Sequence, residues 1–373
     1  MNIGFDAKRI YDNTTGLGGY GRSLLHNLLR WFPQNNYQLF VHEKYFRPSP
    51  FKYQNFVDKT FVSNHYLSDL WRSSDISADI ANSGVEIFHG LSNELPFSMP
   101  ANVKSIVTIH DIIFHKFPDY FPLLDRKIYQ YKVKKACENS SAIVAVSAST
   151  RNDLIEDFKI PEEKIFIVNP SWGREFEYKY TNWFTELLRH KYKIPFQFVL
   201  YVGATSQRKN LKVVIDALEF PENSEFPLVV VSNGGDTLEE MESYVYHKDI
   251  RQRVFFLKNI PWYELPGIYH MAKCLVYPSF YEGFGLPIIE ALRMGVPVVA
   301  SDNSSLREAG GTGATYVEAT DVEGWADAIN KTMMDTSYSQ KLILDGRNYI
   351  ERFTPQVVTS AMVDLYSWVN EYQ

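Results

Sequence analysis

The sequence lacks the features that mark several large classes of protein. It has only two cysteines, Cys137 and Cys274, which are too few and too far apart for a disulfide framework or a zinc-binding pattern. No apolar run is long enough to cross a bilayer, and residues 1–9 carry charges where a signal peptide would carry an apolar core. Together these absences predict a cytoplasmic protein in a reducing compartment.

The sequence also has no excess of basic residues, since its formal net charge is −6 at pH 7. Nucleic-acid binders are usually basic, so we expect no nucleic-acid partner. What the chain does have is material for burial, because 45% of its 373 residues are hydrophobic and 15% are aromatic. A chain of this length is longer than a domain with a single hydrophobic core usually is, so we expect two domains.

Strand-like apolar runs alternate with helical segments along the whole chain. The expected strands are 2–6, 38–42, 85–89, 105–109, 142–146 and 164–168 in the first half, and 198–202, 228–232, 254–257, 274–277 and 296–300 in the second. Such alternation predicts an α/β protein with two Rossmann-like parallel-sheet domains and a ligand between them. Proline, glycine and charged residues without strand signal indicate a linker within 169–189.

One stretch, 277–301, reads as strand, glycine-rich loop, helix, tight turn and strand. Its glycines let the backbone approach a ligand without a Cβ in the way. Pro287 suits the first position of a helix, where its missing N–H would have had no partner. The free N–H groups of Gly285, Leu286 and Ile288 would then point at an anion, which the helix dipole favours.

Two glutamates flank this anion position. Glu282 lies just before it, and Glu290 lies about one turn inside the helix. A ligand with a negative centre and hydroxyl groups on both sides fits the arrangement, as in a sugar joined through a diphosphate to a ribose. A solvated loop carboxylate and a surface helix residue are the ordinary alternatives for the two side chains.

Near the N-terminus, Gly16-Leu-Gly18-Gly-Tyr-Gly21 matches the G-x-G-x-x-G pattern of dinucleotide-binding proteins. That fingerprint should follow its strand at once and be matched by an acid at the end of the next strand. Here polar residues separate strand and glycines, and Glu43 comes only after the next strand has ended. We therefore disfavour a nicotinamide cofactor and expect a glycine-rich loop over 11–21.

His110 and Asp111 end a predicted strand. Strand-end residues of a parallel sheet point into the ligand crevice, so both are placed for chemistry. With His115 they would supply at most three metal ligands, and their spacing fits no zinc pattern, so we expect no metal site. For His110, a hydrogen-bonded core histidine is the ordinary alternative.

The string Glu282-Gly-Phe-Gly-Leu-Pro-x-x-Glu290 resembles the signature of retaining nucleotide-sugar glycosyltransferases of family 4, which have the GT-B fold. The resemblance extends over nearly the whole chain. It implies two Rossmann-like domains facing each other across a cleft. The two domains would be an acceptor-side domain over 1–175 and a nucleotide-sugar domain over 176–355. A terminal helix over 356–373 would cross back onto the first domain.

The same resemblance implies roles for individual residues. His110 would lie beside the donor sugar, Glu282 would accept hydrogen bonds from sugar hydroxyls, and Glu290 would accept them from the ribose. Arg208 and Lys209 would hold the diphosphate. The implied catalytic set is His110, Arg208, Lys209 and Glu282, and the other donor-binding positions are Gly18, Gly19, Asp111, Gly203, Ile260, Gly283, Phe284, Gly285, Leu286 and Glu290.

One position departs from the family pattern. Many members carry an arginine directly after the glycine that closes the 198–202 strand, whereas this chain has Ala204 after Gly203. Arg208 and Lys209 must then supply more of the positive charge that binds the diphosphate. Arginine can grip phosphate oxygens through two donors, and lysine supplies a compact charge.

The resemblance implies retaining transfer of a hexosyl unit, of mannose or glucose type, from a GDP- or UDP-linked donor. The acceptor would be a glycan or a lipid-linked glycan in polysaccharide assembly. No Asp-x-Asp triplet, the usual divalent-metal element of the other large glycosyltransferase fold, occurs in the sequence, so neither metal nor cofactor is expected. A sugar-nucleotide 2-epimerase and a non-catalytic sugar-nucleotide-binding protein remain as alternatives.

Residues 122–139 read as a helix that carries both cations and large apolar side chains. Such a helix is able to lie on an anionic membrane surface. A solvated helix face is the more frequent meaning of a charge run. Peripheral contact with the inner face of a membrane is therefore an open alternative.

Overall fold

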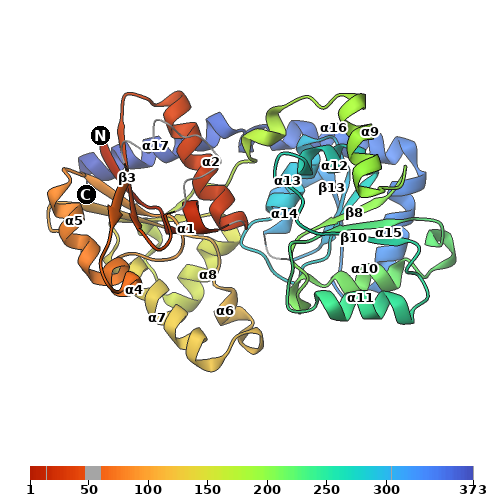
Figure 1. Cartoon of the computed structure of the whole chain (residues 1–373), viewed down its shortest axis with the longest axis horizontal. Coiled ribbons are helices and arrows are strands. Elements are labelled where there is room, and N and C mark those ends of the chain that lie inside the picture. Colours follow the sequence, from red (N-terminus) through yellow and green to blue (C-terminus); the bar gives the residue numbers. More distant parts are fainter. Residues whose placement is uncertain (14, 47–59, 304, 373) are drawn as a thin grey trace. The chain divides into compact units, whose positions relative to one another are not determined.

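The structure is a computed structural model that describes residues 1–373 except 14, 47–59, 304 and 373 (Figure 1). The chain divides into two compact units. The first comprises Met1–Ser171 together with Thr354–Gln373, and the second comprises Trp172–Phe353. The expected boundaries were 175/176 and 355/356, so both breaks fall slightly earlier in the chain than expected.

The first unit is built on a seven-stranded parallel sheet in the order β3-β2-β1-β4-β5-β6-β7. Its strands are β1 (Asn2–Asp6), β2 (Asn36–His42), β3 (Thr60–Ser63), β4 (Ile87–Gly90), β5 (Lys104–Ile109), β6 (Ala142–Ala145) and β7 (Ile165–Ile167). The strand order reverses beside β1, which places a topological switch point between β1 and β4.

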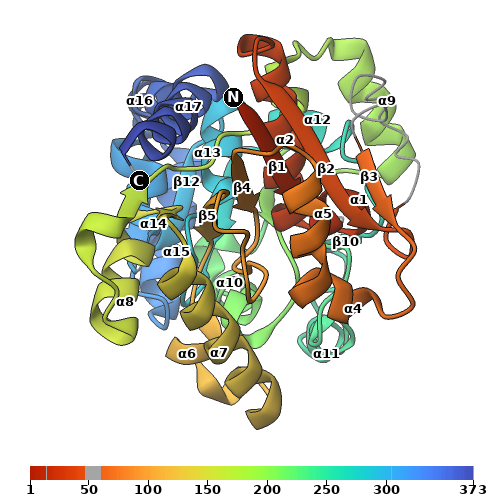
Figure 2. The same cartoon turned by 90° about the vertical axis from the view of Figure 1, so that its left-hand side faces the viewer.

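Helices cover both faces of this sheet (Figure 2). They are α1 (Lys8–Asp12), α2 (Gly16–Trp31), α4 (Ser68–Leu70), a π-helical turn (Trp71–Asp75), α5 (Ile76–Asn82), α6 (Ile113–Lys116), α7 (Leu123–Asn139), α8 (Ala148–Phe158) and α17 (Pro355–Tyr372). Successive strand residues face opposite sides, so Ile106 joins the core under α2 and α17 while Val107 joins the core under α7 and α8.

The terminal helix α17 belongs to the core of the first unit. Its Met362 and Tyr366 are fully buried. The Tyr366 hydroxyl lies 2.8 Å from Nδ1 of His89 on β4, and Nε2 of His89 lies 2.8 Å from the Thr108 hydroxyl on β5. Buried polar groups are nearly always hydrogen-bonded, so this network is satisfied only while α17 is docked.

The second unit is built on a six-stranded parallel sheet in the order β10-β9-β8-β11-β12-β13. Its strands are β8 (Val199–Val202), β9 (Leu228–Val231), β10 (Val254–Leu257), β11 (Cys274–Tyr277), β12 (Val298–Ser301) and β13 (Ala314–Val317). Here the order reverses beside β8, so the switch point lies between β8 and β11.

Helices again lie on both sides of the sheet, with α10, α11 and α15 on one side in Figure 1. The helices of this unit are α9 (Asn182–Tyr192), α10 (Leu211–Ala217), α11 (Leu238–His247), α12 (Leu265–Met271), α13 (Leu286–Arg293), α14 (Leu306–Gly310), α15 (Val322–Met334) and α16 (Thr336–Tyr349). Fully buried Trp325 and Ile329 of α15 pack in the same core as Val230 and Val276.

The two parallel-sheet α/β units confirm the expected fold class, and each expected strand has its counterpart with small shifts at the ends. Two strands were missed, β3 and β13. The expected loop over 11–21 was wrong, because α2 begins at Gly16. The Asn13 side chain accepts from the Gly18 amide, and a Cβ at Gly18 would come within 2.0 Å of the Asn13 carbonyl oxygen. Here glycine permits a tight helix start.

The docking of α17 predicts that Tyr366→Phe destabilises the first unit. The substitution leaves the buried Nδ1 of His89 without its partner, at a cost of about 1–3 kcal/mol. Denaturant unfolding followed by circular dichroism measures the change. Tyr372→Phe on the same helix is the matched control, because Tyr372 is 71% exposed. Equal stabilities for the two variants would show that the hydrogen bond contributes nothing.

Candidate functional site

The switch point of the second sheet collects the expected donor-side residues. Ligands of open parallel sheets bind at the carboxyl ends of the strands where the strand order reverses. Here these ends are those of β8 and β11. The segment after β8 carries Arg208 and Lys209 on a short 3₁₀ turn, Gln207–Lys209, and the loop after β11 carries Glu282.

Arg208, Lys209 and Glu282 form one charge cluster. Oε1 of Glu282 lies 2.9 Å from an Arg208 guanidinium nitrogen and 2.5 Å from Nζ of Lys209. The three side chains are only 12–19% exposed. Burial alone would raise the pKa of Glu282, but the charges of Lys209 and Arg208 outweigh it and lower the pKa to about 2. Glu282 is therefore ionised at neutral pH.

Further contacts link the two segments and fix the cations. Arg208 also donates to the Tyr281 carbonyl at 2.5 Å, and its own carbonyl accepts from the Phe280 amide at 2.9 Å. Nζ of Lys209 lies 2.9 Å from the Tyr277 hydroxyl and 5.0 Å from the centre of that ring. The cluster thus holds the loop after β11 against the loop after β8.

Helix α13 starts directly beyond this loop. Gly285 precedes it with φ +126°, and a Cβ there would meet Leu306 at 3.1 Å, so glycine is needed for both conformation and space. Among the described residues, the Gly285 and Leu286 amides have no acceptor, whereas the Ile288 amide donates to the Gly285 carbonyl at 3.0 Å. The Ile288 amide is therefore not available as one of the expected anion donors. Pro287 occupies the second helical position rather than the first.

Ser305 stabilises the glycine-rich loop through hydrogen bonds, and no sequence pattern predicted this role. Its hydroxyl lies 2.9 Å from the Glu282 carbonyl and 2.8 Å from the Phe284 carbonyl. The Phe284 ring itself is buried against Phe353, with ring centres 5.3 Å apart. The Phe284 side chain therefore belongs to the core, and the loop backbone is what a ligand would meet.

Glu290 occupies a different environment one turn inside α13. Its carboxylate accepts from the Tyr269 hydroxyl at 2.8 Å. Burial raises the pKa of Glu290 from 4.5 to about 7, against the opposing effect of that hydrogen bond. The pKa values of the two glutamates of the motif are thus shifted in opposite directions. The fold favours the charged form of Glu282 and the neutral form of Glu290.

The β8 and β9 loops are joined close to the cluster. The Thr205 amide donates to the Gly234 carbonyl at 3.1 Å, and a Cβ at Gly235 would come within 2.0 Å of the Thr205 carbonyl oxygen. Gly235 was missed because its partner lies far away in sequence. Gly203 follows the end of β8, and Ala204 stands after it where many family members carry arginine. Ile260, an expected donor-binding position, is buried in the loop after β10.

In the first unit, His110 and Asp111 follow β5 as expected. Nε2 of His110 lies 2.8 Å from the Leu91 carbonyl, and the ring meets the Tyr20 ring edge-on with centres 4.8 Å apart. Burial lowers the pKa of His110 to about 4. The imidazole is therefore neutral. Gly18 and Gly19, expected in a loop, lie in the first turn of α2.

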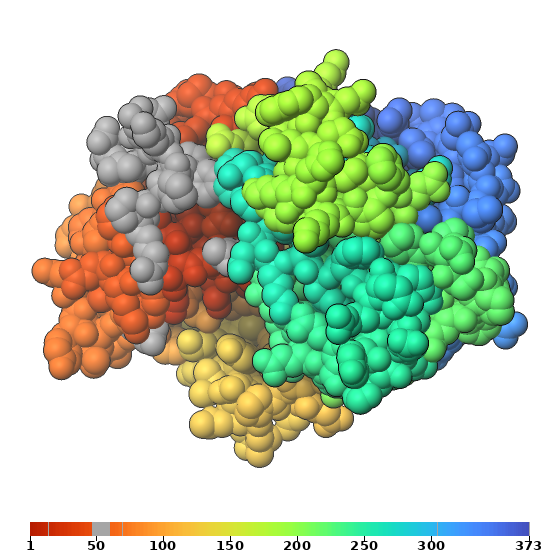
Figure 3. Space-filling view, turned by 45° about the vertical axis from the view of Figure 1, so that its right-hand side comes forward, coloured from red at the N-terminus to blue at the C-terminus, as the bar shows by residue number. Residues whose placement is uncertain are grey.

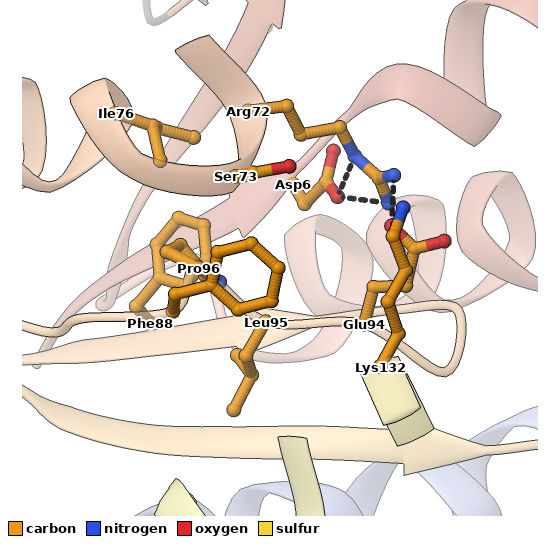
Figure 4. Close-up of a pocket in the computed structure, with 10 residues that line it drawn as sticks. Asp6, Arg72, Ser73, Ile76, Phe88, Glu94, Leu95, Pro96 and Lys132 are labelled. Atoms are coloured by element: carbon orange, nitrogen blue, oxygen red, sulfur yellow. Dashed lines mark hydrogen bonds and ion pairs between the residues drawn. The ribbon is translucent and has the colours of Figure 1, made fainter. Parts of the chain in front are cut away.

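The switch point of the first sheet holds a charge cluster that sequence reasoning missed (Figure 4). Arg72, from the π-helical turn, donates to the Asp6 carboxylate at 2.7 Å and pairs with Glu94. Lys132 of α7 lies 3.6 Å from Glu94. The nearby carboxylates raise the pKa of Arg72 although burial opposes them. The lining of this small pocket includes Leu95 beside the charges.

The structure therefore brings Arg208, Lys209, Glu282 and the start of α13 together within the second unit, and His110 with Asp111 within the first. In the described part of the chain, no group of three or more His, Cys, Asp or Glu side chains is arranged to hold a metal ion. Likewise, none of the described helices is long and apolar enough to cross a membrane.

Comparison with protein families gives the same assignment for both units. Residues 18–171 match the model described as Glycosyltransferase Family 4, and residues 185–349 match the model described as Glycosyl transferases group 1. The chain belongs to glycosyltransferase family 4. Its two parallel-sheet units have the GT-B fold.

Individual relatives of this family 4 glycosyltransferase are distant. O-antigen chain mannosyltransferase B of Escherichia coli is 28% identical over 285 residues, which are 75% of this chain and 74% of that protein. Sucrose-phosphate synthase of Thermosynechococcus elongatus has a TM-score of 0.80 at 19% identity, with 99% of each chain covered. HepE of Anabaena, in complex with UDP-glucose, has a TM-score of 0.77 at 18% identity, with 98% of this chain and 99% of that one covered.

The raised pKa of Glu290 predicts a pH-dependent stability. Between its ordinary pKa of 4.5 and the folded value of about 7, the unfolded chain ionises this carboxyl and the folded chain does not. Stability present at acid pH is therefore lost as pH rises through that window. Glu290→Gln should escape the loss, so its thermal midpoint should gain on wild type across this range, by about 2–4 °C for each kcal/mol that wild type loses.

The measurement is a pair of thermal melts, one below and one above the window, for each variant. Glu323→Gln is the control, because Glu323 is exposed in the first turn of α15. If wild type, Glu290→Gln and the control changed in parallel with pH, Glu290 would not carry the assigned pKa.

Proposed function

We propose that this glycosyltransferase moves a hexosyl unit, of mannose or glucose type, from a nucleotide-diphosphate sugar to a hydroxyl of a glycan or lipid-linked acceptor in polysaccharide assembly, with retention of configuration. The observation that supports it most is the Arg208–Lys209–Glu282 cluster beside the open amides of α13. The O-antigen mannosyltransferase relative and the UDP-glucose complex of HepE agree with such a donor and such a product.

Transfer requires the departing diphosphate and the cationic sugar ring to be stabilised. Donors fixed in advance and aimed at developing charge do this without reorganisation in the transition state. Arg208 and Lys209 would hold the diphosphate together with the Gly285 and Leu286 amides. Glu282 would orient the two cations and face the sugar hydroxyls, and Glu290 would accept from the ribose. The donor is GDP- or UDP-linked.

His110 and Asp111 belong to the proposed donor-sugar side, in the first unit. Acceptor recognition is proposed for that unit as well, near the carboxyl ends of its strands. There the Asp6–Arg72–Glu94 cluster provides carboxylates able to accept hydrogen bonds from hydroxyl groups. With a lipid-linked acceptor the enzyme would work in peripheral contact with the inner face of a membrane.

Donor binding predicts a thermal-shift result. A nucleotide sugar that binds only the folded state raises the midpoint by mass action, so one member of a panel of GDP- and UDP-sugars should stabilise wild type most. Glu290→Ala should reduce that increase, equivalent to a loss of about tenfold in affinity for one lost hydrogen bond. Glu323→Ala is the matched control. An undiminished increase in Glu290→Ala would contradict its ribose role.

Metal independence predicts that turnover survives a chelator. With the donor chosen by the panel and a glycan acceptor, we expect equal initial rates with and without EDTA, because protein cations serve the diphosphate. Product analysis by NMR separates transfer with retention from 2-epimerisation, and absence of any product would leave only binding. Loss of turnover in EDTA, restored by a divalent ion, would overturn the metal-independent mechanism.

A further inference from the structure

His110 lies just beyond the point where the strand pairing of the first sheet ends. The last paired residue of β5 is Ile109, so the peptide groups of His110 have no partner in the sheet. Backbone groups in such a place need hydrogen-bond partners from elsewhere. Oδ1 of Asn93 accepts from the His110 amide at 2.8 Å, and the Thr150 hydroxyl donates to the His110 carbonyl at 3.2 Å. Side chains, not the sheet, therefore hold this peptide.

Asn93 contacts the end of β5 at two further points. Its own amide donates to the Thr108 carbonyl at 2.9 Å, and its Nδ2 lies 3.5 Å from the Asp111 carbonyl. A peptide N–H only donates and a carbonyl only accepts, so one orientation of the Asn93 side-chain amide serves both His110 and Asp111. The backbone of Asn93 has φ +60°, a left-handed conformation in which asparagine is enriched.

The loop that carries Asn93 also fixes the ring of His110. Nε2 of His110 lies 2.8 Å from the carbonyl of Leu91, two residues before Asn93. Because that carbonyl only accepts, Nε2 carries the proton and Nδ1 is left as an acceptor for a sugar hydroxyl. The reach of the Leu91 carbonyl to the ring depends on how this loop is seated against the end of β5, and the Asn93 contacts determine that seating.

The loop is itself held at both ends. A Cβ at Gly90, the last residue of β4, would come within 2.1 Å of the Glu94 carbonyl oxygen, so the loop folds back closely on its strand. The Glu94 carboxylate pairs with Arg72. Between these points Leu91 is buried. Functional groups are placed most accurately when the residues behind them are locked in this way.

From these contacts we propose that Asn93 is a positioning residue for the transfer reaction, which acts by setting the place and the tautomer of His110. The inference rests on the proposed function, in which His110 lies beside the donor sugar, and adds the residue that orients it. A displacement of about 1 Å within an active site can cost about 10²-fold in rate. Loss of the Asn93 side chain should therefore lower kcat, while the donor contacts proposed for the second unit are kept.

The alternative is that Asn93 only forms the turn. Glycine adopts positive φ at least as readily, so Asn93→Gly keeps the turn and removes only the side-chain contacts. Asn93→Asp keeps an oxygen for the His110 amide and should recover part of the rate that Asn93→Gly loses. A residue needed only for the turn would show no loss in Asn93→Gly.

The kinetic test is a double-mutant cycle, run with the nucleotide sugar that most stabilises wild type and a glycan acceptor. We expect Asn93→Gly to lower kcat about tenfold or more and to change the donor KM less than about twofold. In a His110→Ala background the same substitution should cost nothing further, because no imidazole remains to be oriented. Losses that multiply would show that Asn93 acts on the fold rather than through His110.

Two controls match the substitution. Lys159→Gly replaces another residue of positive φ, +56°, at the exposed end of α8 in the same unit. Gln252→Ala removes a side-chain amide that donates to the Asp249 carbonyl at 3.2 Å, in a segment that Figure 3 shows, coloured teal, at the surface of the second unit. Both variants should keep the wild-type kcat.

Nitrogen-15 NMR of the histidine rings tests the inference without turnover. The His110 signals are those that His110→Ala loses, and in wild type they should report the Nε2-protonated tautomer. In Asn93→Gly the shifts of the two ring nitrogens should move toward each other, because the second tautomer becomes populated. An unchanged His110 tautomer in Asn93→Gly would overturn the inference. Absence of turnover in wild type would count against the proposed function alone, since the tautomer still decides the role of Asn93.

Discussion

Glu282 shares one carboxylate oxygen with Arg208 and Lys209, and the candidate donor site depends on this contact. Breaking a buried ion pair by removing one partner typically costs about 3–5 kcal/mol, because the remaining charge is left uncompensated. The cations follow β8 and the carboxylate follows β11, so the contact joins the two strands that border the switch point. Without a ligand, Glu282 is what keeps two neighbouring cations compatible with their partial burial.

That role bears on the proposed binding of a diphosphate at this cluster. The cations are already placed, so a ligand loses little free energy in ordering them. It must, however, share them with Glu282. The two amides at the start of α13 have no acceptor in the described part of the chain and supply the attraction that is not already engaged. Glu290, with a pKa of about 7, would add no full negative charge beside the proposed diphosphate at acid pH.

Much of the fold was predictable because the central strands of the two sheets, such as β4, β6, β8 and β11, are buried on both faces and read as continuous apolar runs. β13 was missed since Ala314–Val317 is short and follows a segment rich in glycine, serine and threonine. The loop expected around Gly18 was wrong for a similar reason, because glycines predict a turn when the tight contact with Asn13 that makes them necessary is unseen.

The candidate site likewise contains residues that the sequence predicts and residues that it does not. The motif at 282–290 and the cations at 208–209 are local strings, and sequence reasoning found them. Ser305, Gly235 and the Asp6–Arg72–Glu94 cluster act through partners distant in sequence, so no spacing rule indicates them. The pKa values of the two glutamates were equally hidden, because they depend on burial and on which charges the fold brings close.

In the first unit, His110 is held by a chain of contacts between residues that are far apart in the sequence. Its ring rests on Tyr20, whose hydroxyl lies 3.3 Å from that of Thr108, and Thr108 in turn meets His89 and, through it, Tyr366 of α17. Since a carbonyl only accepts, Nε2 of neutral His110 must donate to Leu91, which leaves Nδ1 as a hydrogen-bond acceptor. A sugar hydroxyl is a donor of the matching kind. The Leu91 carbonyl therefore sets which hydrogen bond His110 can offer, and α17 supports the ring only indirectly, through His89, Thr108 and Tyr20.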